Sequence, residues 1–107
     1  MSDKKKYILQ ELKSYLIQHL GNDINDIILF GSRTNNNYSK DSDYDILIIV
    51  NKNYNHKYED KIIDLCYDID LKYNILIDPH ILSTAELNTY RGKQPIFINA
   101  INNGIRL

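Results

Sequence analysis

The chain has 107 residues, of which 43% are hydrophobic and 25% are charged, and its formal net charge is −1 at pH 7. These proportions are typical of one small globular domain and exclude a disordered or fibrous chain. The near-neutral charge argues against binding nucleic acid through bulk positive charge, so no direct nucleic-acid binding is expected. The one cysteine, Cys66, cannot form an internal disulfide, which favours a reducing, cytoplasmic compartment. The longest apolar run, Ile46 to Val50, is far shorter than the ~20 residues of a membrane span.

The first half of the chain predicts a helix, a strand, a loop and a second strand. Apolar residues at helical spacing predict a helix that stops at Gly21, which suits a helix end. The β-branched, apolar run Ile24–Phe30 predicts a buried strand that ends at Gly31. Residues 33–42 are polar and turn-forming, which indicates a loop. Residues 43–50 alternate at first and then become continuously apolar, as a central strand does.

The second half predicts a helix, a third strand and two further helices. Apolar residues at helical spacing run from Tyr58 to Ile69. Residues 75–82 predict a strand whose internal proline, Pro79, favours the edge of a sheet or a bulge. Residues 83–86 form a capping box that begins a short helix, and residues 95–104 begin with proline and end with glycine, as a last helix would. We therefore expect an α/β fold in which a small mixed β-sheet is flanked by helices.

Two carboxylates stand at the start of the second strand. Asp43 and Asp45 are two positions apart, so both side chains leave the same face of a strand, with Cα atoms roughly 6.7 Å apart. Tyr44 should point to the opposite face. Two ionised groups ~4 Å apart repel by about 4 kcal/mol at an effective dielectric constant of 20. A compensating cation is therefore expected, and Mg²⁺ prefers such carboxylate oxygens.

A second feature precedes this carboxylate pair. Gly31 directly follows a buried strand, and a glycine there lets the backbone approach a ligand closely. The hydroxyl of Ser32 and backbone N–H groups of a helix start can then hold a phosphate. A phosphate-binding turn and a metal-binding carboxylate pair at adjacent strand ends together indicate a site for a metal–nucleotide complex.

These residues also admit other interpretations. The spacing of the acidic residues imitates a calcium loop, but Ile46 and Lys52 occupy its glycine and glutamate positions, which excludes it. The glycines do not make a phosphate loop or a dinucleotide fingerprint, and nothing indicates a nucleophilic triad. A purely structural alternative remains, in which Asp43 caps a turn and Asp45 pairs with Arg33.

The motif as a whole resembles that of the minimal nucleotidyltransferases of the DNA polymerase β superfamily, which is Gly-Ser, ten residues, then Asp-x-Asp. Here Gly31-Ser32 and Asp43-x-Asp45 match it with ten residues between them. The resemblance implies a polymerase-β-like fold over one domain, residues 1–107. It also implies that the Gly31 backbone and Ser32 bind the triphosphate of ATP or another NTP. Arg33 would lie close enough to help balance the negative charge of the phosphates. Asp43 and Asp45 would hold two Mg²⁺ ions.

The same family uses a third carboxylate on a neighbouring strand, as a metal ligand and to help activate the attacking hydroxyl. The resemblance implies Asp78 for this catalytic and metal-binding role. Asp68 and Asp70 are rivals, but they are expected to end the preceding helix or to face water. The histidines lack partner spacing and are read most simply as surface or core residues. However, His80 follows Asp78 by two positions, so it would share its strand face and could contact the nucleotide.

The resemblance also implies a function and a partner. Minimal nucleotidyltransferases are typically paired with a HEPN-domain RNase toxin and act as its antitoxin by transferring AMP to a toxin tyrosine. We therefore expect a Mg²⁺-dependent adenylyltransferase whose acceptor is recognised through a HEPN partner or a homo-oligomer. One alternative is a non-catalytic module that neutralises the partner by contact. Transfer to a small molecule such as an aminoglycoside is a third possibility, disfavoured because no substrate domain is present.

Overall fold

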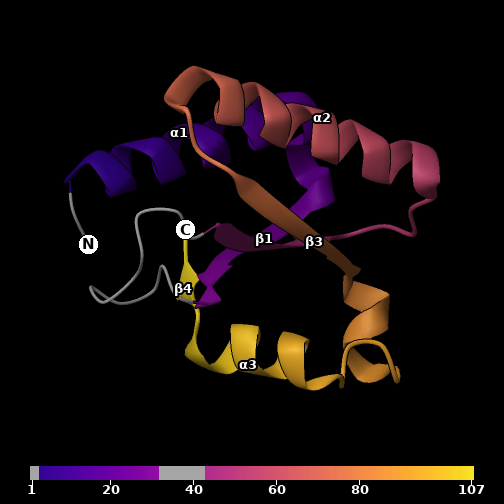
Figure 1. Cartoon of the computed structure of the whole chain (residues 1–107). Coiled ribbons are helices and arrows are strands. Elements are labelled where there is room, and N and C mark those ends of the chain that lie inside the picture. Colours follow the sequence, from indigo (N-terminus) through magenta and orange to yellow (C-terminus); the bar gives the residue numbers. More distant parts are fainter. Residues whose placement is uncertain (1–2, 32–42) are drawn as a thin grey trace.

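The computed structural model describes residues 3–31 and 43–107, in which a central sheet lies between two layers of helices (Figure 1). Helices α1 (Asp3–Leu20) and α2 (His56–Tyr73) cover one face of the sheet. Helix α3 (Pro95–Asn103) covers part of the other face. The structure therefore confirms the expected α/β architecture.

The sheet is mixed, as expected. It contains β1 (Ile24–Phe30), β2 (Tyr44–Val50), β3 (Ile77–Ser83) and β4 (Ile105–Arg106), in the spatial order β3-β2-β1-β4. Strand β1 runs antiparallel to both β2 and β4, whereas β2 and β3 are parallel. The proline-containing strand β3 lies at an edge, as its sequence predicted.

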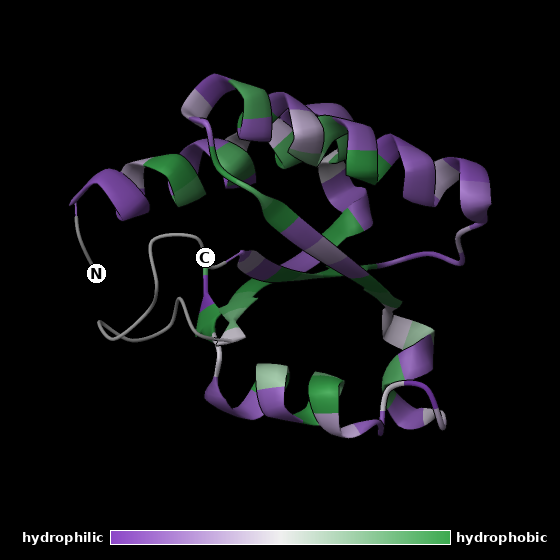
Figure 2. Cartoon of the chain, in the orientation of Figure 1, coloured by the Kyte–Doolittle hydropathy of each residue, from purple (hydrophilic) through white to green (hydrophobic). Residues whose placement is uncertain are grey.

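Strand β2 is buried on both faces, which explains its continuous apolar run (Figure 2). Ile46, Ile48 and Val50 pack toward α1 and α2, whereas Leu47 and Ile49 pack on the side of α3. All of these side chains are at most 2% exposed. A central strand buried on both faces cannot shift by one residue without moving the flanking side chains to the wrong layer, so its register is strongly specified.

Local sequence signals account for most element boundaries. Gly21 follows α1 at a φ of +56°, a conformation that favours glycine. The side chain of Asn55 caps α2 by accepting a hydrogen bond from the Tyr58 backbone N–H at 2.9 Å. The capping box forms between Ser83 and Glu86. The short helix that it begins, Thr84–Asn88, is a 3₁₀ helix.

Strand β4 is absent from the sequence prediction. Its two residues pair with Ile28 and Leu29 of β1, and Arg106 Nη1 lies 2.7 Å from Asp26 Oδ2. A two-residue strand is too short to show an alternating pattern, so hydrophobic periodicity cannot reveal it.

Among the described residues, no helix has the length and hydropathy required for a membrane span.

Candidate active site

Two carboxylates from neighbouring strands come together at one end of the sheet. Asp45 and Asp78 are direct register partners in the parallel pair β2–β3, and Phe30 lies opposite Asp45 on β1. One ligand atom from each of Asp45, Asp78 and His80 can be chosen so that all three atoms lie within 4.8 Å of one another. These side chains lie on the same face of the sheet as Leu47, the next residue of β2 on that face, which packs in the cluster that includes α3.

His80 is held against both Asp78 and Phe30. Its Nε2 atom lies 3.3 Å from Asp78 Oδ2, and its ring meets that of Phe30 edge-on, with centroids 5.3 Å apart. The His80 side chain is 25% exposed and that of Asp78 is 51% exposed. The imidazole is therefore fixed between an apolar neighbour and an accessible carboxylate.

The electrostatics of Asp45 reflect this crowding. Burial, followed by the negative charge of Asp78, raises the pKa of Asp45 above its ordinary value. The charge of Asp43 acts in the same direction, and His80 opposes it. Burial and repulsion both disfavour the ionised form. A cation between these carboxylates would relieve the repulsion, so the donor set suits a divalent metal ion.

Gly31 makes room for Asp45. Its φ is +76°, and a Cβ atom built there would lie 2.3 Å from Asp45 Oδ2. Both facts require glycine, because other residues rarely adopt this backbone conformation and a methyl group would collide with the carboxylate. The sequence predicts that Gly31 allows close approach of a ligand. The structure adds that the same missing side chain accommodates one of the acidic residues.

Asp43 lies immediately before β2 and is half-buried. Its negative charge contributes to raising the pKa of both Asp45 and Asp70, so it belongs to the same electrostatic neighbourhood. Tyr44, between the two aspartates, is buried against the layer of α1 and α2, on the opposite face as predicted. Ser32 and Arg33 lie outside the described residues, as does the alternative pairing of Asp45 with Arg33.

The rival carboxylates Asp68 and Asp70 have structural contacts. Asp68 accepts a hydrogen bond from the Tyr15 hydroxyl, which ties α2 to α1. Asp70, 9% exposed, accepts a hydrogen bond from the Ile77 backbone N–H through Oδ1 at 2.9 Å. This contact fixes the first residue of β3 and thereby helps to place Asp78, the residue that follows.

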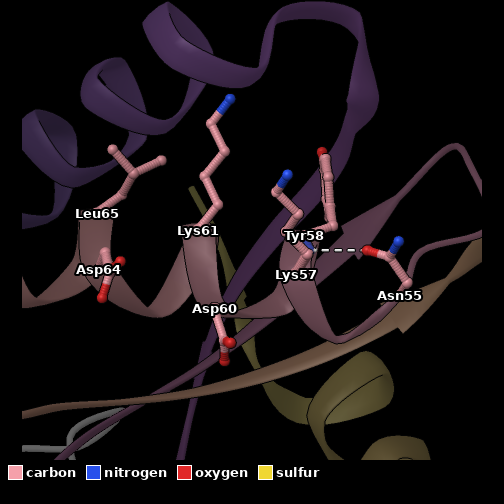
Figure 3. A pocket seen from close by; sticks show the side chains of 7 residues that line it. All are labelled: Asn55, Lys57, Tyr58, Asp60, Lys61, Asp64 and Leu65. Atoms are coloured by element: carbon pink, nitrogen blue, oxygen red, sulfur yellow. Dashed lines mark hydrogen bonds between the residues drawn. The ribbon is translucent and has the colours of Figure 1, made fainter.

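A pocket elsewhere offers a poorer site. It has a volume of about 530 Å³ and is lined by seven residues of α2 and the turn before it (Figure 3). One of them, Tyr58, hydrogen-bonds Asp23 just before β1 begins, whereas Asp45 lies opposite Phe30 where β1 ends. The pocket is therefore at the other end of the sheet from the carboxylates. Its charged side chains, Lys57, Asp60, Lys61 and Asp64, have mixed signs and do not form a convergent set of ligands.

Comparison with known proteins identifies the class. Residues 10–106 match the family model described as polymerase beta, nucleotidyltransferase. Because this match spans most of the chain, the protein belongs to the polymerase beta nucleotidyltransferase family. This is the family that the Gly-Ser–Asp-x-Asp motif resembles.

Two relatives from Methanocaldococcus jannaschii support this assignment. "Putative protein adenylyltransferase MJ0141" is 38% identical over 72 residues, which are 67% of this chain and 73% of the relative. A second protein of the same printed description, MJ0604, is 41% identical over 64 residues, which are 60% of this chain and 58% of the relative. A crystal structure of a mutant toxin-antitoxin MntA-HpeT has the same fold, with a TM-score of 0.60 and 12% identity. That likeness covers 91% of this chain and 69% of the other.

His80 lies on the same strand face as Asp78. Its i+2 spacing from Asp78 placed both on one strand face, and that signal is correct. What the sequence could not show is that Asp45 would be level with Asp78 and Phe30 would support the imidazole, because both facts depend on the register of three strands.

Proposed function

We propose that this protein is a Mg²⁺-dependent adenylyltransferase that transfers AMP from ATP to a hydroxyl group of a HEPN-domain toxin, acting as its antitoxin. The observation that carries the proposal is the convergence of Asp45 and Asp78 beside Gly31, at the end of the Gly-Ser–Asp-x-Asp motif. Family membership supports nucleotidyl transfer. The printed names of the two relatives support AMP as the group transferred and a protein as the acceptor.

In this proposal Asp43, Asp45 and Asp78 hold the metal ions, and Gly31 and Ser32, with Arg33 nearby, bind the triphosphate. Bound Mg²⁺ would neutralise charge on the reacting phosphate and stabilise the developing charge on the attacking and leaving oxygens. The carboxylates fix where the metal ions, and hence the α-phosphate, can lie. Rigid placement of this kind supplies most of the catalysis in phosphoryl-type transfers.

The proposed reaction is an in-line displacement at the α-phosphorus. The acceptor hydroxyl oxygen forms a bond to the α-phosphorus, the bond from that phosphorus to the α–β bridging oxygen breaks, and pyrophosphate leaves. The hydroxyl proton passes to the carboxylate of Asp78. Asp78 suits this role because it is half exposed on the edge strand β3 and can meet an incoming acceptor.

The open position of the site supports a macromolecular acceptor. Strand β3 has no strand on its outer side within the described sheet, so a protein side chain can approach Asp78 from that side. The structural neighbour is a toxin-antitoxin protein, which favours a toxin as the acceptor. A tyrosine hydroxyl of a HEPN partner is the acceptor that we propose, with both proteins in the cytoplasm.

The test is transfer of labelled AMP from α-labelled ATP to a co-purified HEPN partner. The wild-type chain should label the partner only with Mg²⁺ present, and peptide mass spectrometry should locate AMP on a tyrosine. Asp45→Asn should abolish labelling. Asp64→Asn is the matched control, because Asp64 is exposed on α2, which covers the face of the sheet opposite the one that carries Asp45 and Asp78.

Neutralisation of the toxin is measured with the same variants. If Asp45→Asn loses labelling but still neutralises the partner, neutralisation occurs by contact, and the proposal that AMP transfer inactivates the toxin is wrong. If labelling appears on a small-molecule hydroxyl and not on the partner, the proposed acceptor class is wrong.

A further inference from the structure

We propose that Nε2 of His80 is a ligand of the divalent cation held by Asp45 and Asp78, and that this nitrogen shifts the preference of the site from Mg²⁺ toward Mn²⁺. The inference deepens the proposed function and rests on it for the presence of a cation. It assigns a metal-selecting role to a residue outside the Asp-x-Asp motif.

The geometry places all three donors around one point. A ligand atom from each of Asp45, Asp78 and His80 can be chosen so that the three atoms lie within 4.8 Å of one another. Adjacent ligands of an octahedral ion, each about 2.2 Å from the metal, are roughly 3.1 Å apart, and opposite ligands are roughly 4.4 Å apart. The separation of 3.3 Å between His80 Nε2 and Asp78 Oδ2 matches the adjacent arrangement.

The imidazole is also held in place without a metal ion. Its ring meets Phe30 edge-on at a centroid distance of 5.3 Å, and Phe30 lies opposite Asp45 in the sheet. Because His80 and Asp78 are two residues apart on the same strand, the backbone fixes both donors on one face. A ligand that is already oriented loses little conformational freedom on binding.

The donor chemistry determines the expected selectivity. Mg²⁺ strongly favours oxygen ligands and gives up its water reluctantly. Imidazole nitrogen suits transition metals, and Mn²⁺ accepts it together with carboxylates. A set of two carboxylates and one imidazole therefore raises the affinity for Mn²⁺ relative to Mg²⁺, compared with an all-oxygen set.

A simple structural role makes a different prediction. If His80 only pairs with Asp78, its replacement would change the affinities for Mg²⁺ and Mn²⁺ by the same factor, and no nitrogen would lie next to bound Mn²⁺. The distance of 3.3 Å between Nε2 and Asp78 Oδ2 is compatible with both roles, so the two are separated by how the metal ions respond.

The first experiment is pulsed electron paramagnetic resonance of Mn²⁺ added to an excess of the full chain. Directly coordinated imidazole nitrogen produces a characteristic ¹⁴N modulation of the electron spin echo. We expect that modulation in the wild-type protein and its loss in His80→Gln. His56→Gln is the control and should retain it, because His56 is exposed at the start of α2. A modulation that persists in His80→Gln, or is absent from the wild type, overturns the proposal.

The second experiment is calorimetric titration with Mn²⁺ and with Mg²⁺. Glutamine offers an oxygen where histidine offered a nitrogen, so His80→Gln should retain Mg²⁺ binding while its preference for Mn²⁺ falls at least about tenfold. An equal change for both metals overturns the selectivity. A retained near-ultraviolet circular dichroism spectrum shows that the variant is folded.

These readouts separate this inference from the proposed function. If His80 binds Mn²⁺ but no AMP is transferred, the ligand assignment holds and the adenylyltransferase proposal fails. If AMP is transferred with Mg²⁺ but bound Mn²⁺ shows no coordinated nitrogen, the adenylyltransferase proposal holds and the assignment of His80 as a ligand fails.

Discussion

Replacing Gly31 with alanine should damage the site more than the fold. The added Cβ would lie 2.3 Å from Asp45 Oδ2, and ordinary contact begins at 3.4 Å. The carboxylate is the movable partner, so it must shift by about 1 Å, and a displacement of that size can reduce a catalytic rate about 100-fold. We therefore expect Mg²⁺-dependent ATP binding to weaken at least tenfold in Gly31→Ala.

The cost in stability follows from the backbone. Alanine at a φ of +76° costs about 1–2 kcal/mol in folding free energy. With a urea m-value of roughly 1–3 kcal/mol/M, the midpoint of unfolding should fall by about 0.3–2 M.

The matched control is Gly21→Ala. Gly21 also has a positive φ, +56°, but a Cβ there meets nothing within 4 Å. It should therefore lower the urea midpoint by a similar amount and leave calorimetric ATP binding unchanged. If the two variants bind Mg²⁺–ATP equally well, the idea that Gly31 places the Asp45 carboxylate is refuted.

Three further predictions concern Asp45, Cys66 and the capping box. Burial and the charge of Asp78 raise the folded-state pKa of Asp45 above 3.8, so the stability supplied by its protonated form is lost as pH rises through that pKa. Asparagine resembles the protonated form, so Asp45→Asn should resist urea better than wild type at pH 7, and this gain should vanish below pH 3.8. A less stable variant at pH 7 would contradict this. Burial raises the pKa of the Cys66 thiol from 9.0 to about 12, so an aromatic disulfide that reacts with thiols should modify the unfolded protein at pH 8 but not the native protein. The contribution of the neutral Cys66 thiol to stability should be lost as pH rises from 9 toward 12. Ser83→Ala removes the acceptor for the Glu86 backbone N–H at 3.2 Å and should cost about 1 kcal/mol in urea unfolding; no loss would show that the capping box is not stabilising.

Much of the fold could be predicted because its signals are local. Strand β1 has the bounds expected from its apolar run, Ile24–Phe30, and the last helix begins at Pro95 and stops before Gly104. Strand β4 could not be predicted, because its two residues become a strand only through pairing with β1.

The site residues also differ in how far local sequence signals predict them. Asp43 and Asp45 are recognisable from their spacing, which is a property of one strand. That Asp78 lies level with Asp45 depends on the β2–β3 register, which α2 and the contact between Asp70 and Ile77 help to set. The sequence predicts that Gly31 allows close approach of a ligand; that it also makes room for Asp45 depends on the pairing of β1 with β2, which no local pattern encodes.

The pairing of Asp45 with Asp78 also has a consequence for how long the protein survives in a cell. The two carboxylates belong to different strands joined through the whole of α2, so they meet only when that crossover is folded. A ligand bound to both stabilises the folded chain by an amount that grows with its concentration relative to its dissociation constant. Proteases cut such a chain mainly when it opens. The proposed metal–nucleotide complex would thus slow degradation, and turnover of this protein would rise when cellular ATP falls.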